Sequence, residues 1–295
     1  LYLLIQGIKM DYGLALSGGG ARGSAHIGIL MALAEENMLP SSIAGTSAGS
    51  IIAGLYAANV SIDTMQKIAQ ILTSHPTTIL DPDIIGMLLF FPQFLTCRQQ
   101  HLTGLLKGHK LNNFLCSYTD GKDISDLNTQ LVIPAVDLIS GNTIAFTNSE
   151  IKYPTENVIW KKSGKLCDII TASCSVPGIF RPVKMNAYYL VDGGVTHNLP
   201  VNLLMSTGVD KIIAVDIGVD YKTPHNNSIT EILSHSFSIM SYNLKTCLSQ
   251  GERLLLEPSL NKNAGLLTFN MINDCIKAGY VYGKKMIPKI KDALK

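Results

Sequence analysis

The stretch YGLALSGGGARG, residues 12–23, decides how this chain folds. Residues 12–16 have the length and composition of a short buried strand, and they run directly into a turn of consecutive glycines. A helical pattern follows over residues 21–36, with apolar side chains on one face at Ile27, Leu30, Met31 and Ala34. A strand, a glycine-rich turn and a helix in this order are typical of α/β proteins.

The same order of elements repeats immediately. Residues 42–44 read as a second short strand, which turns at GTSAG (residues 45–49) into an apolar helix over 50–58. This βαβα order predicts a mainly parallel sheet in a single α/β domain over residues 11–295. Further strands are expected at 130–136, 143–147, 188–191, 211–216 and 253–256, and further helices at 165–174, 201–206, 230–248 and 273–294.

The composition narrows the class of protein. The chain has 295 residues, of which 46% are hydrophobic and 16% charged, so it has enough apolar material for a large core. The net charge of +2 is too small to indicate nucleic acid as a partner.

The six cysteines are scattered, at positions 97, 116, 167, 174, 247 and 275, with no CxxC pair. Neither a metal site nor a disulfide is expected from this spacing in a chain of this length. Residues 1–10 are expected to be a leader or upstream extension, because residues 1–8 are too short to span a bilayer and lack the features of a signal peptide. Together these observations predict a reduced, cytoplasmic protein.

The turn Gly45-x-Ser47-x-Gly49 has the form of a nucleophile elbow. In such a turn the serine occupies a strained strand-to-helix junction, and glycines stand on both sides because any side chain there would clash. The motif is short enough to arise by chance, but here it lies between an apolar strand and an apolar helix, as the chemistry requires.

The glycine-rich turn itself, from Gly18 to Gly23, spells GxGxxG and has two interpretations. A dinucleotide-binding turn would need an acidic residue at the end of the second strand, where the GTSAG turn stands instead. An oxyanion hole needs only backbone amides at a helix N-terminus, which consecutive glycines expose. Arg22 either adds a positive charge to that hole or forms an ion pair at the surface.

Asp192-Gly193-Gly194 follows the strand at 188–191. Alone, this sequence is a common turn, but with the two preceding motifs it completes a set of nucleophile, oxyanion donors and carboxylate. Both Ser47 and Asp192 are expected at carboxyl ends of strands, where α/β sites form. His197 is the best candidate for a classical triad, and the order of residues in α/β-hydrolases also leaves His225 and His235 open.

These motifs together resemble the patatin-like phospholipases, especially short bacterial members related to the neuropathy target esterase catalytic domain. The segments that carry the resemblance are 14–28, 43–49, 137–141, 172–182, 192–200 and 212–218. The resemblance implies a three-layer α/β/α sandwich with a mainly parallel sheet. It also implies a Ser47–Asp192 dyad without a histidine, an oxyanion hole from Gly18, Gly19, Gly20, Ala21 and Arg22, and no metal or other cofactor.

The implied activity is hydrolysis of phospholipid, lysophospholipid or other acyl esters. An aspartate that acts as the base must have a raised pKa, so Asp192 is expected to be desolvated. Two other functions stay open: a non-catalytic lipid-binding or regulatory protein on the same fold, and a dinucleotide-binding oxidoreductase.

The segment DIIGMLLFFPQFL, residues 83–95, stands apart from these motifs. It is strongly apolar yet too short for a membrane span. One interpretation is a core or lid helix broken by Pro92. The other is a lipid-facing cap over the active site, which would give the protein peripheral contact with a membrane.

Overall fold

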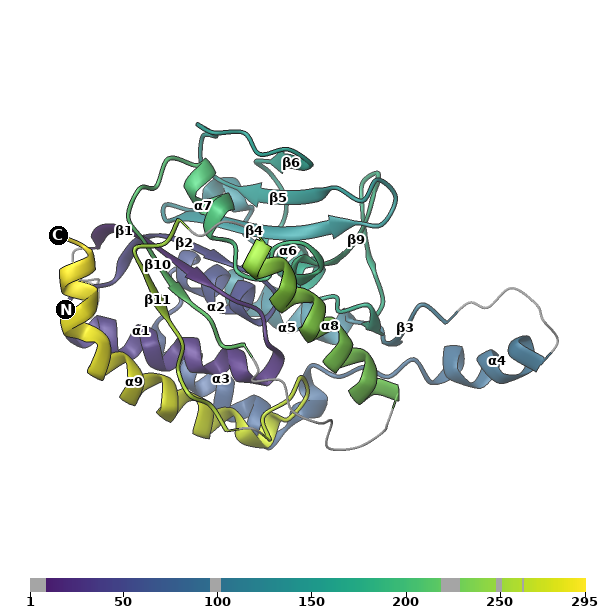
Figure 1. Cartoon of the computed structure of the whole chain (residues 1–295). Coiled ribbons are helices and arrows are strands. Elements are labelled where there is room, and N and C mark those ends of the chain that lie inside the picture. The colour runs from purple at the N-terminus through teal and green to yellow at the C-terminus, as the bar shows by residue number, and fades with distance from the viewer. Residues whose placement is uncertain (1–8, 96–101, 219–228, 248–250, 262) are drawn as a thin grey trace.

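The computed structural model describes residues 9–95, 102–218, 229–247, 251–261 and 263–295 (Figure 1). Its centre is a nine-stranded sheet in the order β11-β10-β1-β2-β4-β5-β6, with β9 also paired to β4 and β8 to β9. The bounds of the strands are β1 Met10–Leu16, β2 Pro40–Gly45, β4 Gln130–Asp137, β5 Thr143–Thr147, β6 Val158–Lys161, β8 Val183–Met185, β9 Tyr188–Asp192, β10 Ile212–Val215 and β11 Leu254–Leu256. A separate two-stranded ribbon joins β3 (Gly104–Leu106) to β7 (Gly178–Phe180).

The sheet is mainly parallel, as expected. β11, β10, β1, β2 and β4 run parallel to one another in succession, and β5 runs parallel to β6. The antiparallel pairs are β4 with β5, β4 with β9, and β8 with β9. The fold is of the α/β class that the sequence predicts. However, β9 pairs with β4 in the antiparallel sense, so it runs in the opposite direction to β2.

The helices are α1 (Ala25–Glu35), α2 (Ala48–Ala57), α3 (Ile62–Ser74), α4 (Ile84–Leu95), α5 (His109–Thr119), α6 (Leu166–Ser173), α7 (Val201–Ser206), α8 (Ile229–Cys247) and α9 (Ile272–Ala293). Short 3-10 helices include η1 (Gly20–Ser24) and η4 (Gly193–Val195). The predicted helix over 21–36 is therefore η1 followed by α1. Neither α3 nor α5 was predicted from the sequence, although Ser61 caps the N-terminus of α3 and apolar residues recur along it at Met65, Ile68 and Ala69.

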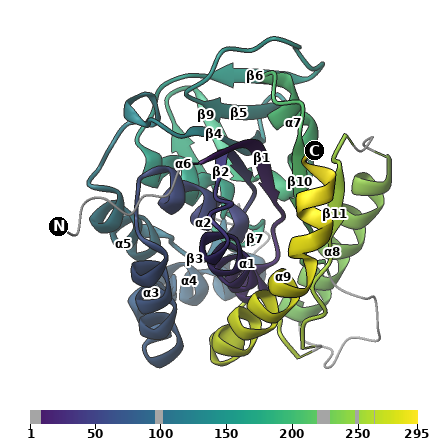
Figure 2. The same cartoon turned by 90° about the vertical axis from the view of Figure 1, so that its left-hand side faces the viewer.

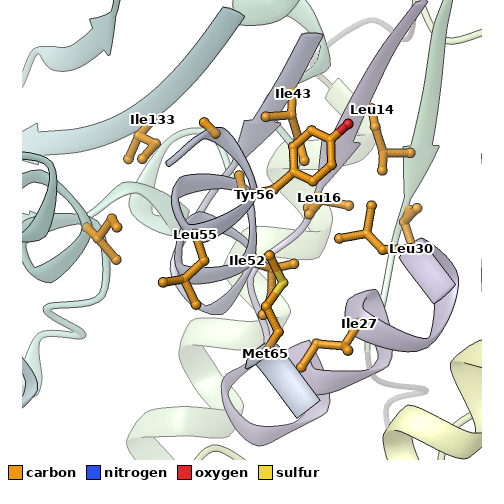
Figure 3. Close-up of a cluster of buried hydrophobic side chains, with 14 of the residues drawn as sticks. Leu14, Leu16, Ile27, Leu30, Ile43, Ile52, Leu55, Tyr56, Met65 and Ile133 are labelled. Carbon is orange, nitrogen blue, oxygen red and sulfur yellow. The ribbon is translucent and has the colours of Figure 1, made fainter. Parts of the chain in front are cut away.

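Alternating side chains of the strands build the two cores of the sandwich. Leu14, Leu16 and Ile43 face the larger core, which they share with α1, α2, α3 and α9 (Figures 2 and 3). The opposite face carries mostly small residues, Ala15, Ala44, Ala145 and Ala214, against Val201, Leu203 and Leu204 of α7. Because these alanines are small, the six-residue helix α7 can lie close to the sheet and cover this face.

Helix α4 corrects one expectation. It continues without a break through Pro92 to Leu95, so the break at Pro92 in one of the two interpretations of this segment was wrong. The expected leader falls mostly on residues 1–8, which lie outside the described residues. Within the described part of the chain, no helix is both long enough and apolar enough to cross a membrane.

Cys116 of α5 and Cys167 of α6 form a disulfide, with their Cα atoms 5.0 Å apart. The prediction that the chain has no disulfide was wrong, because sequence spacing could not show that these two helices pack against each other. Cys174 and Cys275 are free and buried. The disulfide removes one of the two arguments for a cytoplasmic location, which stays a prediction.

We expect removal of this disulfide to lower the free energy of unfolding by about 2–4 kcal/mol, because the crosslink spans 51 residues and restricts the unfolded chain. The measurement is urea unfolding of Cys116→Ala/Cys167→Ala beside the oxidised wild type. The double variant must also become insensitive to added reductant. Equal unfolding midpoints for the two proteins would contradict this account.

Candidate active site

Ser47 lies between the end of β2 and the start of α2 in a strained backbone conformation, with φ 52° and ψ −124°. The turn closes tightly around it. A Cβ at Gly45 would lie 2.2 Å from the carbonyl oxygen of Gly49, and a Cβ at Gly49 would lie 2.5 Å from that of Leu16. Only glycine fits at either position, so the turn has the build of the expected nucleophile elbow.

Asp192 lies near Ser47 at the end of a strand that runs in the opposite direction to β2. Val132 of β4 pairs with β2 and β5 at once, and Ala135 pairs with β9 and β5 at once. Since a strand has only two edges, β2 and β9 must lie one after the other along the same edge of β4. β2 is parallel to β4 and β9 is antiparallel, so their carboxyl ends face each other, with Ser47 after one and Asp192 at the other.

Both residues thus lie at carboxyl ends of strands, as expected from the sequence, but the two strands were expected to be parallel. The head-to-head arrangement depends on the reversal between β4 and β9, which no local sequence pattern reveals.

The Asp192 carboxyl group is almost completely buried, with 1% of the residue exposed. Burial raises its pKa from the ordinary value to about 7, while hydrogen bonding from the Ser47 hydroxyl and the Gly194 amide opposes that rise. The prediction that Asp192 is desolvated and has a raised pKa is confirmed. At neutral pH such a carboxylate is far more basic than an exposed aspartate.

The two carboxylate oxygens of Asp192 have different surroundings. Oδ1 accepts a 2.7 Å hydrogen bond from the Gly194 amide. Oδ2 is buried and accepts no fully formed hydrogen bond within the described residues. The interaction of Asp192 with the Ser47 hydroxyl is strong enough to lower the Asp192 pKa, but it is looser than a regular hydrogen bond. Such loose contacts are common in catalytic sites without substrate.

The glycine-rich turn lies directly beside this pair. A Cβ at Gly18 would lie 3.0 Å from the Ser47 Cβ and 2.6 Å from Oδ1 of Asn198. The Gly18 amide donates to the Asn198 carbonyl, and the Ala21 amide donates to the Leu266 carbonyl. Gly18 and Ala21 were both expected to supply the oxyanion hole, but their amides form hydrogen bonds that hold the turn in place.

The amides of Gly19 and Gly20 differ from those of Gly18 and Ala21. Both residues are half-buried, and within the described part of the chain neither amide donates to a protein acceptor. Gly20 has a φ of 59°, which favours glycine, and its Cβ position is occupied by the Leu266 backbone. The role of these two amides as oxyanion donors stays a prediction.

Arg22 is held in place by contacts that the sequence does not predict, and its expected role as a positive charge beside the oxyanion hole stays a prediction. It is buried, and its guanidinium donates to the carbonyl oxygens of Ile217 and Gly218 at 2.9 and 2.6 Å. The interpretation as a surface ion pair was wrong. Arg22 ties the glycine-rich turn to the segment that follows β10.

The other expected glycines allow close packing around the site. A Cβ at Gly23 would lie 2.4 Å from the Ala48 Cβ, and a Cβ at Gly193 would lie 2.4 Å from the Pro134 carbonyl oxygen. Gly194 supplies the amide that binds Asp192.

The end of α6 contacts both halves of the site, which sequence reasoning missed. The Ser173 hydroxyl accepts a 3.1 Å hydrogen bond from the Ser47 amide, and the Ser175 carbonyl accepts one of 3.0 Å from the Asp192 amide. Both serines lie in the segment 172–182 that carries part of the family resemblance, which was the available signal. The same helix carries Cys167, so the disulfide joins α5 to the element that supports the pair.

His197 and His26 bind groups other than this pair. The His197 ring contacts the hydroxyls of Thr143 and Thr196 at 3.2 and 3.0 Å, and burial lowers its pKa to about 4. His26 is buried in α1, where its ring contacts the Ser17 carbonyl. His235 lies on α8, and His225 lies outside the described residues.

Among the residues that the structure describes, the groups around the pair form no cluster that could hold a metal ion. Within the described residues, the group of potential ligands close enough to share an ion is Cys116, Cys167 and Asp168, and its two sulfur atoms are joined in the disulfide.

Comparison with known proteins identifies the family to which the sequence is similar. The pattern that defines the patatin-like phospholipases matches residues 14–205. Relatives named as lysophospholipases include one from Emericella nidulans, 27% identical over 95% of this chain, and one from Candida albicans, 30% identical over 72%. The chain covers 18% and 14% of their respective lengths.

Two solved structures also match over 95% of this chain. They are VipD from Legionella pneumophila, with 14% identity, a TM-score of 0.49 and 67% of that chain covered, and the type III effector ExoU, with 13% identity, a TM-score of 0.48 and 53% covered.

We expect Asp192→Asn to become more stable relative to wild type as the pH rises from 5 to 8. The folded-state pKa of Asp192 lies above its unfolded value, so the stability that its proton contributes is present at low pH and lost as the pH rises through about 7. Asparagine holds no titrating proton. The difference in unfolding free energy should therefore grow by an amount on the order of a few kcal/mol.

Urea unfolding of both proteins at several pH values measures this difference, and other titrating groups cancel from it. A difference that stays constant over this range would contradict the burial of an ionisable Asp192.

Proposed function

This chain belongs to the patatin-like phospholipase family, and from that premise we propose that it is a serine lipid acyl hydrolase with Ser47 as nucleophile and Asp192 as base. The observation that carries the proposal is the meeting of the strained Ser47 turn and the buried Asp192 carboxylate at the facing ends of β2 and β9. The relatives named as lysophospholipases support a lysophospholipid or phospholipid substrate.

In the proposed first step, Ser47 Oγ attacks the ester carbonyl carbon while its proton passes to Oδ2 of Asp192. The Oδ2 atom is the natural acceptor because Oδ1 already binds the Gly194 amide. The amides of Gly19 and Gly20 would stabilise the negative oxygen of the tetrahedral intermediate. The intermediate then collapses to an acyl-serine, and Asp192 returns the proton to the departing alcohol oxygen.

In the second step a water molecule attacks the acyl-serine. Asp192 takes one proton from that water and then gives it to Ser47 Oγ as the ester bond breaks, so the fatty acid leaves and the free serine is restored. The strained backbone of Ser47 keeps the hydroxyl in one position through both steps, and the 3.1 Å hydrogen bond to Ser173 helps to hold it there.

We expect Ser47→Ala and Asp192→Asn each to lower kcat for ester hydrolysis by a factor on the order of 10⁴, because each removes one half of the proton transfer. A chromogenic short-chain ester assay with purified protein measures the loss. His197→Ala is the matched control and should retain most of the activity, since the ring contacts threonines rather than the pair.

If His197→Ala were as damaging as Asp192→Asn, a triad would replace the dyad. Equal rates for wild type and Ser47→Ala would instead favour a non-catalytic lipid-binding protein.

The pH dependence of kcat/KM should report the titration of Asp192. A base must be deprotonated to act, so activity should rise with pH and level off above an apparent pKa of about 7. His197, whose pKa is lowered to about 4, would be neutral throughout this range. A rate that is already maximal at pH 5 would contradict the role of a buried carboxylate as base.

A further inference from the structure

Two helices expose large apolar side chains to solvent. On α4, Ile84, Ile85 and Leu88 are 63%, 67% and 70% exposed. On α8, Ile232, Ile239 and Met240 are 48%, 39% and 58% exposed. We call these six residues the apolar docking surface. A folded protein rarely leaves so many large aliphatic side chains in water unless they bind something.

Helix α8 connects this surface to the proposed dyad. Its Ser241 hydroxyl donates a 3.0 Å hydrogen bond to the Gly194 carbonyl, and a Cβ at Gly194 would lie 3.4 Å from the Phe237 ring. Gly194 in turn binds the Asp192 carboxylate through its amide. Helix α8 therefore lies directly on the loop that holds the base.

Two of the exposed residues, Ile232 and Ile239, lie on the side of α8 opposite Ser241. At about 100° per residue, Ile232 and Ile239 project roughly 180° away from Ser241. One side of the helix thus covers the Asp192 loop, and the other presents aliphatic side chains to the surroundings.

Helix α4 is anchored to the same region. The Asp83 carboxylate immediately before it forms an ion pair with Arg181, and the Asp83 amide donates to the Leu105 carbonyl next to the β3–β7 ribbon. Leu233 of α8 lies 3.5 Å from the Cβ position of Gly178 in that ribbon. Figure 1 shows α4 extending outward beside β3 and α8 descending toward the same side of the molecule.

The chemistry of α4 identifies what covers it. Its 12 residues carry no charge, and the acid at its base is neutralised by Arg181. The helix is too short to span a bilayer but suits burial at the boundary between head groups and acyl chains. An enzyme for lipid esters must meet its substrate at such a boundary, because long-chain phospholipids are aggregated in water.

We propose that the apolar docking surface of α4 and α8 binds the surface of a lipid aggregate and holds the Ser47 site against it. This inference rests on the proposed function, since the lipid surface is taken to present the substrate. The proposed surface lies outside the catalytic site. Helix α8 would belong to both, since it contacts the Asp192 loop on one side and would contact the lipid on the other.

The test compares vesicle binding with hydrolysis of a soluble ester. The variants are Ile85→Asp/Leu88→Asp on α4 and Ile232→Asp/Ile239→Asp on α8. The matched control is Val281→Asp, which changes a 59% exposed aliphatic residue on α9. Three properties of each protein are measured. The first is cosedimentation with phosphatidylcholine vesicles, the second is release of fatty acid from lysophosphatidylcholine contained in those vesicles, and the third is hydrolysis of a short-chain ester in solution.

We expect both double variants to lose vesicle binding and vesicle hydrolysis by about tenfold or more, because each places two carboxylates in the interface. Their rate on the soluble ester should stay within about twofold of wild type, since neither pair contacts the Ser47 site. Val281→Asp should behave like wild type in all three assays.

Unchanged vesicle binding of either double variant would overturn the joint surface. The proposal would also be overturned if sedimentation velocity without lipid showed a dimeric wild type and monomeric double variants. In that case the surface would bind a second copy of the chain. If wild type binds vesicles but hydrolyses neither substrate, the hydrolase proposal fails while the lipid-binding surface stands.

Discussion

The structure depends on one unfavourable arrangement, a carboxylate that is buried next to a serine hydroxyl. Transfer of a charged group from water into the protein interior is costly unless partners compensate it. For Asp192 the compensation is incomplete, because one oxygen accepts from the Gly194 amide and the other has no hydrogen-bond partner within the described residues. The raised pKa is the direct result, and it is also what would make this aspartate useful as a base.

The surrounding elements hold this arrangement from several sides. The elbow forces Ser47 into a conformation with positive φ, and the facing carboxyl ends of β2 and β9 bring the two residues together. The end of α6 then binds the amide of each residue through Ser173 and Ser175. Because one helix end serves both, a shift of α6 would disturb the nucleophile and the base together. The disulfide to α5 restrains the other end of this short helix.

The sequence was most informative where the structure is local. The GTSAG turn, the glycine-rich turn and most helices could be predicted because consecutive residues determine their geometry. The direction of β9, the Cys116–Cys167 contact and the burial of Arg22 depend on tertiary packing, so the spacing of residues could not reveal them. The same limit applies to the oxyanion donors. Among the described residues, the amides of Gly18 and Ala21 donate within the protein and those of Gly19 and Gly20 do not, a difference that the sequence does not show.

The measurement that tests the central claim most directly is the site and rate of reaction with a fluorophosphonate, which modifies activated serines covalently. Peptide mass spectrometry after labelling locates the modified residue. The account predicts modification at Ser47 alone, faster at pH 8 than at pH 5, and almost none in a protein that carries Asp192→Asn. Modification at another serine, or equal labelling with asparagine at position 192, would contradict it.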